Sequence, residues 1–235
     1  MKYEHIVQGH FLERPNRFIA RVLTDGKEVT CHVKNTGRCR ELLIPGVQVF
    51  LEYHPDAAAL GRKTEYSLIG VKKETQNGPV LINMDSQAPN QAAFEWLAGK
   101  SGVSDLRREV TFGNSRFDLA FKKAGIPSFM EVKGVTLEDN GIARFPDAPT
   151  ERGIKHLLEL KHAAQEGYAA SVLFVIQMKG IRSFEPNMAT HPAFGEALND
   201  VSRSGVKVMA YDCIITADSI VLDQPVKVSL PDPGK

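Results

Sequence analysis

The sequence has little net charge and no long hydrophobic run. Its 29 lysines and arginines stand against 28 aspartates and glutamates, a net charge of +1. This balance excludes a protein that coats nucleic acid through bulk positive charge, although a local basic groove remains compatible with it. Since no run of about 18 apolar residues is present, we expect no membrane span and no membrane partner.

Cysteines are also few, and none has metal-type spacing. The three are Cys31, Cys39 and Cys213, an odd number that argues against a disulfide framework. The first residues, Met1-Lys2-Tyr3-Glu4-His5, lack the apolar core of a secretion signal. We therefore expect a cytoplasmic protein in a reducing compartment.

What is present is ordinary for a globular protein. Hydrophobic residues make up 43% and charged residues 24% of the 235 positions, enough for one large domain or two smaller ones. The oligomeric state is left open.

The first part of the chain is rich in predicted strands. Asp25-Gly26 between two alternating runs is a strong hairpin signal. Five short strands are expected, at 18–24, 28–33, 47–53, 64–71 and 80–83. This pattern predicts an OB-like β-barrel over residues 1–85, with an SH3-like barrel or a sandwich as alternatives.

The remainder, residues 86–235, mixes strands and helices. A helical connector is expected within 86–104, with its helix over 91–99. Further strands are predicted at 107–112, 115–121, 128–136, 171–178, 206–211 and 214–222, and helices at about 150–166 and 192–204. This order indicates an α+β domain, a mixed sheet flanked by helices.

Three carboxylates can be aligned on that sheet. With two-residue turns at Gly113-Asn114 and Ala124-Gly125, Glu109 faces Asp118 and Asp118 faces Glu131. Opposed side chains lie about 5 Å apart at Cβ, and Lys133 shares the face of Glu131 because alternate strand residues do. The register is assumed, and a longer turn would shift it.

Such a row is costly without a partner, because neighbouring carboxylates repel one another. A divalent cation such as Mg²⁺ or Mn²⁺ removes the repulsion and can activate water for attack on a phosphodiester. Asp118 and Glu131 are the candidate ligands, with the Val132 carbonyl as a third, and Lys133 can stabilise developing charge. The alternative is a solvated Glu-x-Lys ion pair.

The helix near residue 150 adds a candidate basic face. Arg152, Lys155 and His156 recur at helical spacing and could contact phosphates, or form a solvated face with internal ion pairs. Thr150 or Asp147 is expected to cap the helix, and Pro149 suits its first turn. A buried stripe is predicted at Ile154, Leu157, Leu158 and Ala164. Asp147 and Glu151 are alternative metal ligands.

These residues resemble a known family. Asp118 followed by Glu131-Val132-Lys133 resembles the PD-(D/E)xK nuclease core, with Phe117 where a proline usually stands. The motifs 35–38, 62–66, 115–118, 131–137 and 145–160 together resemble the sugar fermentation stimulation protein A family. The resemblance implies an N-terminal OB-like domain, a restriction-endonuclease-like domain, DNA binding with little sequence preference, and a link to sugar, notably maltose, metabolism.

The barrel supplies further nucleic-acid candidates. A positive groove on the barrel could be lined by Arg17, Arg38, Arg62 and Lys63. Outside the barrel, Arg116 lies two residues before Asp118 and is a further candidate for nucleic-acid binding. The aromatics Phe11, Phe18, Tyr53 and Tyr66 could stack on bases, although most are expected in the core. Asn35-Thr36-Gly37-Arg38 is either a phosphate cradle or a plain turn.

The sequence thus favours a DNA-binding protein that retains a metal-dependent nuclease site formed by Glu109, Asp118, Glu131 and Lys133. One alternative is a non-catalytic DNA-binding regulator of sugar metabolism on a nuclease scaffold. Another is an RNA-end or nucleotide-processing enzyme.

Overall fold

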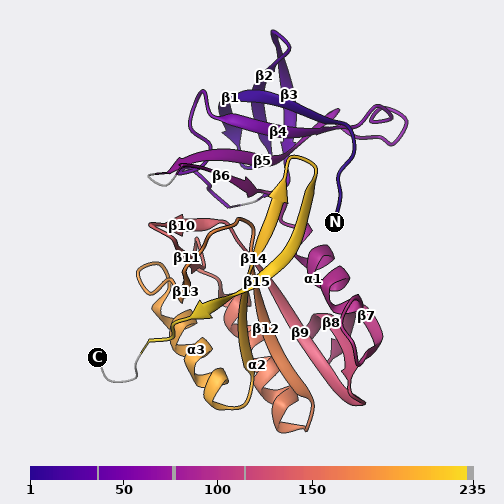
Figure 1. The fold of residues 1–235 in the computed structure, drawn as a ribbon, viewed down its shortest axis with the longest axis vertical. Helices are drawn as coiled ribbons and strands as arrows, with labels where there is room; N and C mark the ends of the chain where they lie inside the picture. Colours follow the sequence, from indigo (N-terminus) through magenta and orange to yellow (C-terminus); the bar gives the residue numbers. More distant parts are fainter. Residues whose placement is uncertain (36, 76–77, 114, 232–235) are drawn as a thin grey trace. The chain divides into compact units, whose positions relative to one another are not determined.

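The computed structural model describes all residues except 36, 76–77, 114 and 232–235 (Figure 1). Thr36 of the predicted cradle and Asn114 of the predicted turn lie outside the described residues. The chain forms two compact units. The first comprises Met1–Ala88 together with Gln177–Lys179 and Cys213–Val221, and the second comprises the rest.

The first unit contains a six-stranded sheet that closes on itself. Its strands are β1 (Ile6–Asn16), β2 (Ile19–Thr24), β3 (Lys27–Val33), β4 (Gln48–Tyr53), β5 (Tyr66–Thr75) and β6 (Gly78–Asn83). They lie in the order β3-β2-β1-β4-β5-β6, and a parallel pairing of β3 with β5 closes the barrel. This arrangement confirms the OB-like barrel.

The predicted hairpin between β2 and β3 is also confirmed. Asp25 and Gly26 both have positive φ, 50° and 73°, as a two-residue type I′ turn requires. Strand β1, however, escaped the sequence prediction. Only Gly9 and Phe11 of its residues are buried, so its hydrophobic alternation is weak.

The second unit is built on a nine-stranded mixed sheet, although the end of β14 (Lys207–Thr216) and the start of β15 (Ser219–Val228), within Cys213–Val221, belong to the first unit. Its strands are β7 (Val103–Phe112), β8 (Ser115–Lys123), β9 (Ile126–Val135), β10 (Leu137–Asp139), β11 (Ile142–Phe145), β12 (Ala169–Ile176), β13 (Ser183–Pro186), β14 and β15. The order is β10-β11-β13-β15-β14-β12-β9-β8-β7. Strands β7, β8 and β9 pair antiparallel, whereas β12 pairs parallel with both β9 and β14. The predicted mixed sheet is confirmed.

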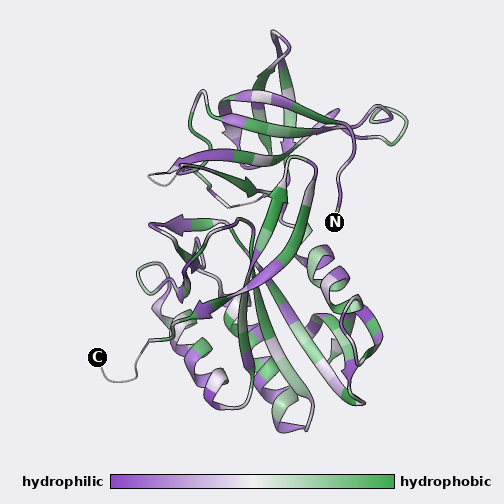
Figure 2. Ribbon diagram, viewed as in Figure 1, coloured by the Kyte–Doolittle hydropathy of each residue, from purple (hydrophilic) through white to green (hydrophobic). Residues whose placement is uncertain are grey.

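Strand β12 is the hydrophobic centre of this sheet. All its residues except Ala169 are buried, and apolar residues gather there and on the neighbouring strands (Figure 2). Such a continuous apolar run is typical of a strand with both faces covered. Helix α1 (Ala88–Ala98) packs on β14 through an edge contact of Trp96 with Tyr211, whose ring centroids lie 5.0 Å apart.

Helix α2 (Glu151–Gln165) packs against β8, β9, β12 and α3 (Pro192–Arg203). Thr150 caps α2 as predicted, its Oγ1 accepting from the Gly153 N–H at 3.0 Å, and Pro149 therefore precedes the helix instead of lying in its first turn. The predicted buried stripe is only partly correct. The buried face is Gly153, Leu157, Leu160 and Ala163, whereas Leu158 is 50% exposed.

Two other details differ from the sequence prediction. The short strands β10, β11 and β13, of three or four residues each, were missed. Strand β14 runs through residues 212–213, where a break was expected. Asp212 is buried there, and its carboxylate accepts the Gln224 N–H at 3.0 Å and the Gly180 N–H at 3.4 Å, which offsets the cost of burial. No helix of the described part of the chain is long and apolar enough to cross a membrane.

Gln177 is far along the chain from strand β6, but it belongs to the first unit and bonds to residues at the end of that strand and just after it. Its Nε2 donates to Asn83 O, Asn83 Oδ1 and Asp85 O at 2.9–3.1 Å, and its side chain is buried.

We expect Gln177→Ala to lower the free energy of unfolding by about 1–3 kcal/mol, because buried acceptors lose their donor. Hydrogen exchange along β6 measures this loss. Gln48→Ala, which removes an exposed amide, is the matched control; equal protection in both variants would contradict the role of Gln177.

Candidate functional site

The β8–β9 hairpin brings two of the predicted carboxylates together. Leu119 pairs with Met130 and Ala120 with Phe129, so the assumed register of this hairpin is confirmed and Asp118 lies opposite Glu131. The turn residues Ala124 and Gly125 both have positive φ, as a two-residue turn requires. Strands β7 and β8 also have the expected register, since Arg108 pairs with Leu119.

Asp118 is half-buried and firmly held. Its Oδ2 accepts the backbone N–H of Val132 and its Oδ1 accepts Asn90 Nδ2, both at 2.8 Å. Burial, and then the negative charge of Glu131, raise the pKa of Asp118 above its ordinary value despite these hydrogen bonds. The surroundings of Asp118 therefore disfavour the charged form of its carboxylate, and a bound cation would offset this effect.

Glu131 is almost completely buried, at 1% exposure. Its Oε1 accepts hydrogen bonds from Lys133 Nζ, at 2.7 Å, and from His156 Nδ1. Burial opposes ionisation, but the hydrogen bonds from His156 and Lys133 and the positive charge of Lys133 outweigh it and hold the pKa of Glu131 below its ordinary value. Oε2 is also buried, yet it has no hydrogen-bond partner among the described residues.

Helix α2 contributes two of its predicted basic residues to this cluster. His156 Nε2 accepts from Arg152 Nε at 3.3 Å, so Nδ1 carries the proton that bonds to Glu131. Lys155 is exposed on the same helix. Glu151 is 88% exposed and lies 3.4 Å from His191 Nε2, and Asp147 is exposed.

Glu109 does not join the pair. Its backbone has a positive φ of 52°, and its side chain is 65% exposed, with Oε2 3.5 Å from Arg116 Nη1. The expected row of three carboxylates is thus wrong as a geometric prediction. In the described part of the chain, no three His, Cys, Asp or Glu side chains gather closely enough to hold a metal.

Asn90 is the site residue that sequence reasoning missed. It lies in α1, 28 residues before Asp118, and donates to that carboxylate. A lone asparagine at a helix start has no distinctive spacing to the hairpin. In the sequence it stands directly before the helix expected over 91–99, and nothing there ties it to the hairpin.

On the barrel, the predicted cations have different surroundings. Arg17, Arg38 and Lys63 are exposed. Arg62 is half-buried, and its Nη2 donates to Ser67 Oγ at 2.8 Å. Arg17 and Arg38 belong to one assembly, because the guanidinium of Arg14 donates to the carbonyls of both.

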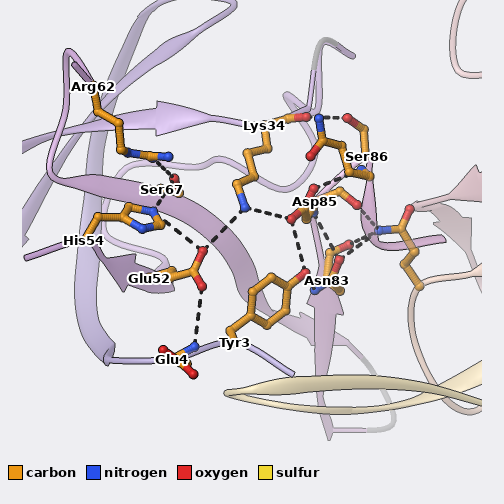
Figure 3. A network of polar contacts seen from close by, with 12 residues as sticks. Tyr3, Glu4, Lys34, Glu52, His54, Arg62, Ser67, Asn83, Asp85 and Ser86 are labelled. Carbon is orange, nitrogen blue, oxygen red and sulfur yellow. Dashed lines mark hydrogen bonds and ion pairs between the residues drawn. The ribbon is translucent and has the colours of Figure 1, made fainter. Parts of the chain in front are cut away.

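The first unit also contains a buried network of polar and charged side chains (Figure 3). The Asp85 side chain is 1% exposed and accepts Lys34 Nζ at 3.0 Å, and Lys34 also lies 3.4 Å from Glu52. Tyr3 Oη donates to Asp85 at 3.4 Å; burial and the charge of Asp85 raise the pKa of Tyr3. His54 Nε2 lies 3.6 Å from Glu52 and 3.0 Å from Ser67 Oγ, which makes this network continuous with Arg62.

These two units, an OB-like barrel and a mixed α+β sheet with a paired Asp–Glu site, define the class of the protein. Residues 12–82 match the family described as SfsA N-terminal OB domain, and residues 87–219 match the sugar fermentation stimulation protein RE domain. The chain belongs to the sugar fermentation stimulation protein family.

Relatives and a solved structure agree with this placement. The chain is 56% identical over 232 residues to a sugar fermentation stimulation protein homolog of Desulfitobacterium hafniense, covering 98% of this chain and 99% of that protein. It is 54% identical to a homolog of Alkaliphilus oremlandii, covering 97% and 98%. The structure of Pyrococcus furiosus SfsA in complex with Ca²⁺ superposes with a TM-score of 0.83 at 26% identity, covering 97% of this chain and 98% of that one.

Proposed function

We propose that the chain is a cytoplasmic DNA-binding protein that hydrolyses phosphodiester bonds with Mg²⁺ or Mn²⁺. The observation that carries this proposal is the buried Oε2 of Glu131, which lacks a partner among the described residues and lies beside a second, electrostatically stressed carboxylate, Asp118. Buried acceptors are rarely left unsatisfied in folded proteins, and such exceptions often mark catalytic sites or ions.

The donor set fits a hard divalent cation. Asp118 and Glu131 would hold it, with the Val132 carbonyl as a further ligand. Mg²⁺ is usually held by one or two carboxylates and keeps several waters, and Asp118 and Glu131 would supply those two carboxylates. Such an ion supplies Lewis-acid stabilisation and an activated water. The related Pyrococcus furiosus protein, in complex with Ca²⁺, binds another cation that prefers oxygen ligands, which supports the proposal.

The other residues of the site position these groups and supply charge. Asn90 and the Val132 N–H fix the two oxygens of Asp118, so its carboxylate keeps one orientation. Lys133 is 14% exposed and is placed to stabilise negative charge on a reacting phosphate. Glu109 is retained as an outer carboxylate that holds Arg116 at the rim.

Basic side chains would bind the phosphates of DNA on each unit separately. On the second unit we assign phosphate contacts to the α2 residues Arg152 and Lys155 and to Arg116 on β8. The predicted contact of His156 is not retained, because its two ring nitrogens already bond to Glu131 and Arg152. On the barrel we assign them to Arg17, Arg38, Arg62 and Lys63. Contacts to phosphates carry no sequence information, which accords with binding that has little sequence preference.

Lys133 provides the test of catalysis. Single-stranded, branched and mismatched DNA, and an RNA arm, are incubated with purified chain and Mn²⁺. We expect Lys133→Met to lower kcat about 10²–10³-fold while Mn²⁺ still binds, because a charge-stabilising group is lost and both carboxylates remain. Lys122→Met, on the same strand pair, is the control. Equal cleavage by both variants would contradict the assignment, and cleavage confined to RNA would favour the RNA-processing alternative.

A second candidate is a non-catalytic DNA-binding regulator of sugar metabolism. The observation that favours it is the engagement of Glu131 Oε1 by both Lys133 and His156, which already neutralises part of the site without a metal. If no DNA is cut and Lys133→Met changes neither binding nor cleavage, this candidate replaces the nuclease proposal.

A further inference from the structure

The turn between β1 and β2 presents an exposed aromatic ring. Phe18 is 50% exposed, and among the twelve phenylalanines of the chain it alone is exposed. The other candidate aromatics of the barrel are occupied: Phe11 is buried, and Tyr53 and Tyr66 pack on each other with ring centroids 5.1 Å apart. Phe18 therefore carries free ring surface.

The backbone of this turn is fixed. Asn16 Oδ1 accepts the N–H groups of Phe18 and Ile19 at 2.9 and 3.1 Å, and Phe18 O accepts the Val33 N–H at 2.8 Å. A ligand that packs on Phe18 meets a turn that is already ordered, so little conformational entropy of the turn is lost on binding.

Arg14 ties the turn to the loop that follows β3. Its guanidinium donates to Arg17 O at 2.6 Å and to the carbonyls of Asn35, Gly37 and Arg38 at 2.7, 2.9 and 2.8 Å. Because these donors serve the backbone, Arg14 is a positioning residue here. The exposed side chains of Arg17 and Arg38 remain to meet solvent or a ligand.

Positive charge lies directly beside the ring. The guanidinium carbon of Arg17 is 5.8 Å from the centroid of Phe18. In OB-folds the β1–β2 and β4–β5 loops border the oligonucleotide face, and here the β4–β5 loop contains Arg62 and Lys63. An exposed aromatic with neighbouring cations is the combination that binds a base and its phosphate together.

We propose that Phe18 is a base-stacking site for single-stranded DNA, with Arg17 neutralising the adjacent phosphate. The proposal rests on the proposed DNA binding and narrows it to a strand form. A paired base inside a duplex has both faces covered by its neighbours, whereas a single strand offers base faces to an aromatic ring.

The test compares Phe18→Ala with Phe18→Trp in the full chain. Fluorescence anisotropy measures binding of a labelled oligothymidylate and of a duplex of equal length. We expect Phe18→Ala to weaken single-strand binding about 5- to 100-fold and to leave duplex binding unchanged. Phe18→Trp, which keeps an aromatic ring, should bind the single strand as the wild type does. Ile44→Ala, which removes another exposed apolar side chain of the barrel, should change neither.

Salt dependence separates stacking from charge. The slope of log affinity against log salt for the single strand should be unchanged in Phe18→Ala and shallower by about 0.7 in Arg17→Ala. Suppose that the wild type binds DNA. If Phe18→Ala then binds both the single strand and the duplex as the wild type does, or if its affinity for both falls equally, the stacking site is overturned and DNA binding stands. If wild type binds neither form, both proposals fall.

Discussion

Replacing Asp118 by asparagine is expected to reduce metal-dependent DNA cleavage at least about 100-fold without destabilising the fold. Loss of residues that merely support a metal ligand costs about 10–100-fold, so loss of a ligand's charge should cost no less. The fold should tolerate the change, because the carbonyl oxygen of the introduced amide can still accept the Val132 N–H, and Asn90 can rotate its own amide to pair with the new one.

Stability makes this prediction specific. The charged Asp118 is disfavoured by burial and by Glu131, so removing its charge should leave the metal-free thermal midpoint unchanged or raise it. Asp105→Asn, which alters an exposed carboxylate paired with Lys122 on β8, is the control for cleavage. Retained cleavage in Asp118→Asn, or loss of cleavage with a collapse of thermal stability, would contradict the assigned role.

The second large effect concerns the buried network of the barrel. Lys34→Met is expected to lower the free energy of unfolding of the first unit by about 3–5 kcal/mol, because the buried Asp85 carboxylate loses its ion partner. The double variant Lys34→Met/Asp85→Asn should recover much of that loss. Lys2→Met, in a pair whose side chains are 77% and 43% exposed, should cost under about 1 kcal/mol.

Hydrogen exchange in β3 and β4 is the suitable measurement, because two units need not unfold in one step. Trp96, the single tryptophan, packs on Tyr211 in the second unit, so its fluorescence reports that unit. Equal exchange in Lys34→Met and Lys2→Met would show that Asp85 does not depend on Lys34.

Local chemistry explains what the sequence could predict. The two-residue turn at Ala124-Gly125 determines the β8–β9 register, and that register alone places Asp118 opposite Glu131. The capping of α2 by Thr150 also follows from neighbouring residues. Both features depend on residues close together in the chain.

Features that depend on distant residues were missed. Asn90 reaches Asp118 across 28 positions, and Lys34 reaches Asp85 across 51.

Glu109 was placed by counting residues along β7, but its positive φ turns the side chain toward Arg116. The balanced net charge conceals acidic residues in different surroundings: Asp85, Glu131 and Asp212 are buried, whereas others such as Glu109 and Glu151 are exposed.

Calorimetric titration with Mn²⁺ tests the central claim most directly. The account predicts one ion bound per wild-type chain and none by Asp118→Asn, with the Asp105→Asn control binding as wild type does. Absence of binding to the wild-type chain, or equal binding to the wild type and Asp118→Asn, would contradict a metal site at Asp118 and Glu131.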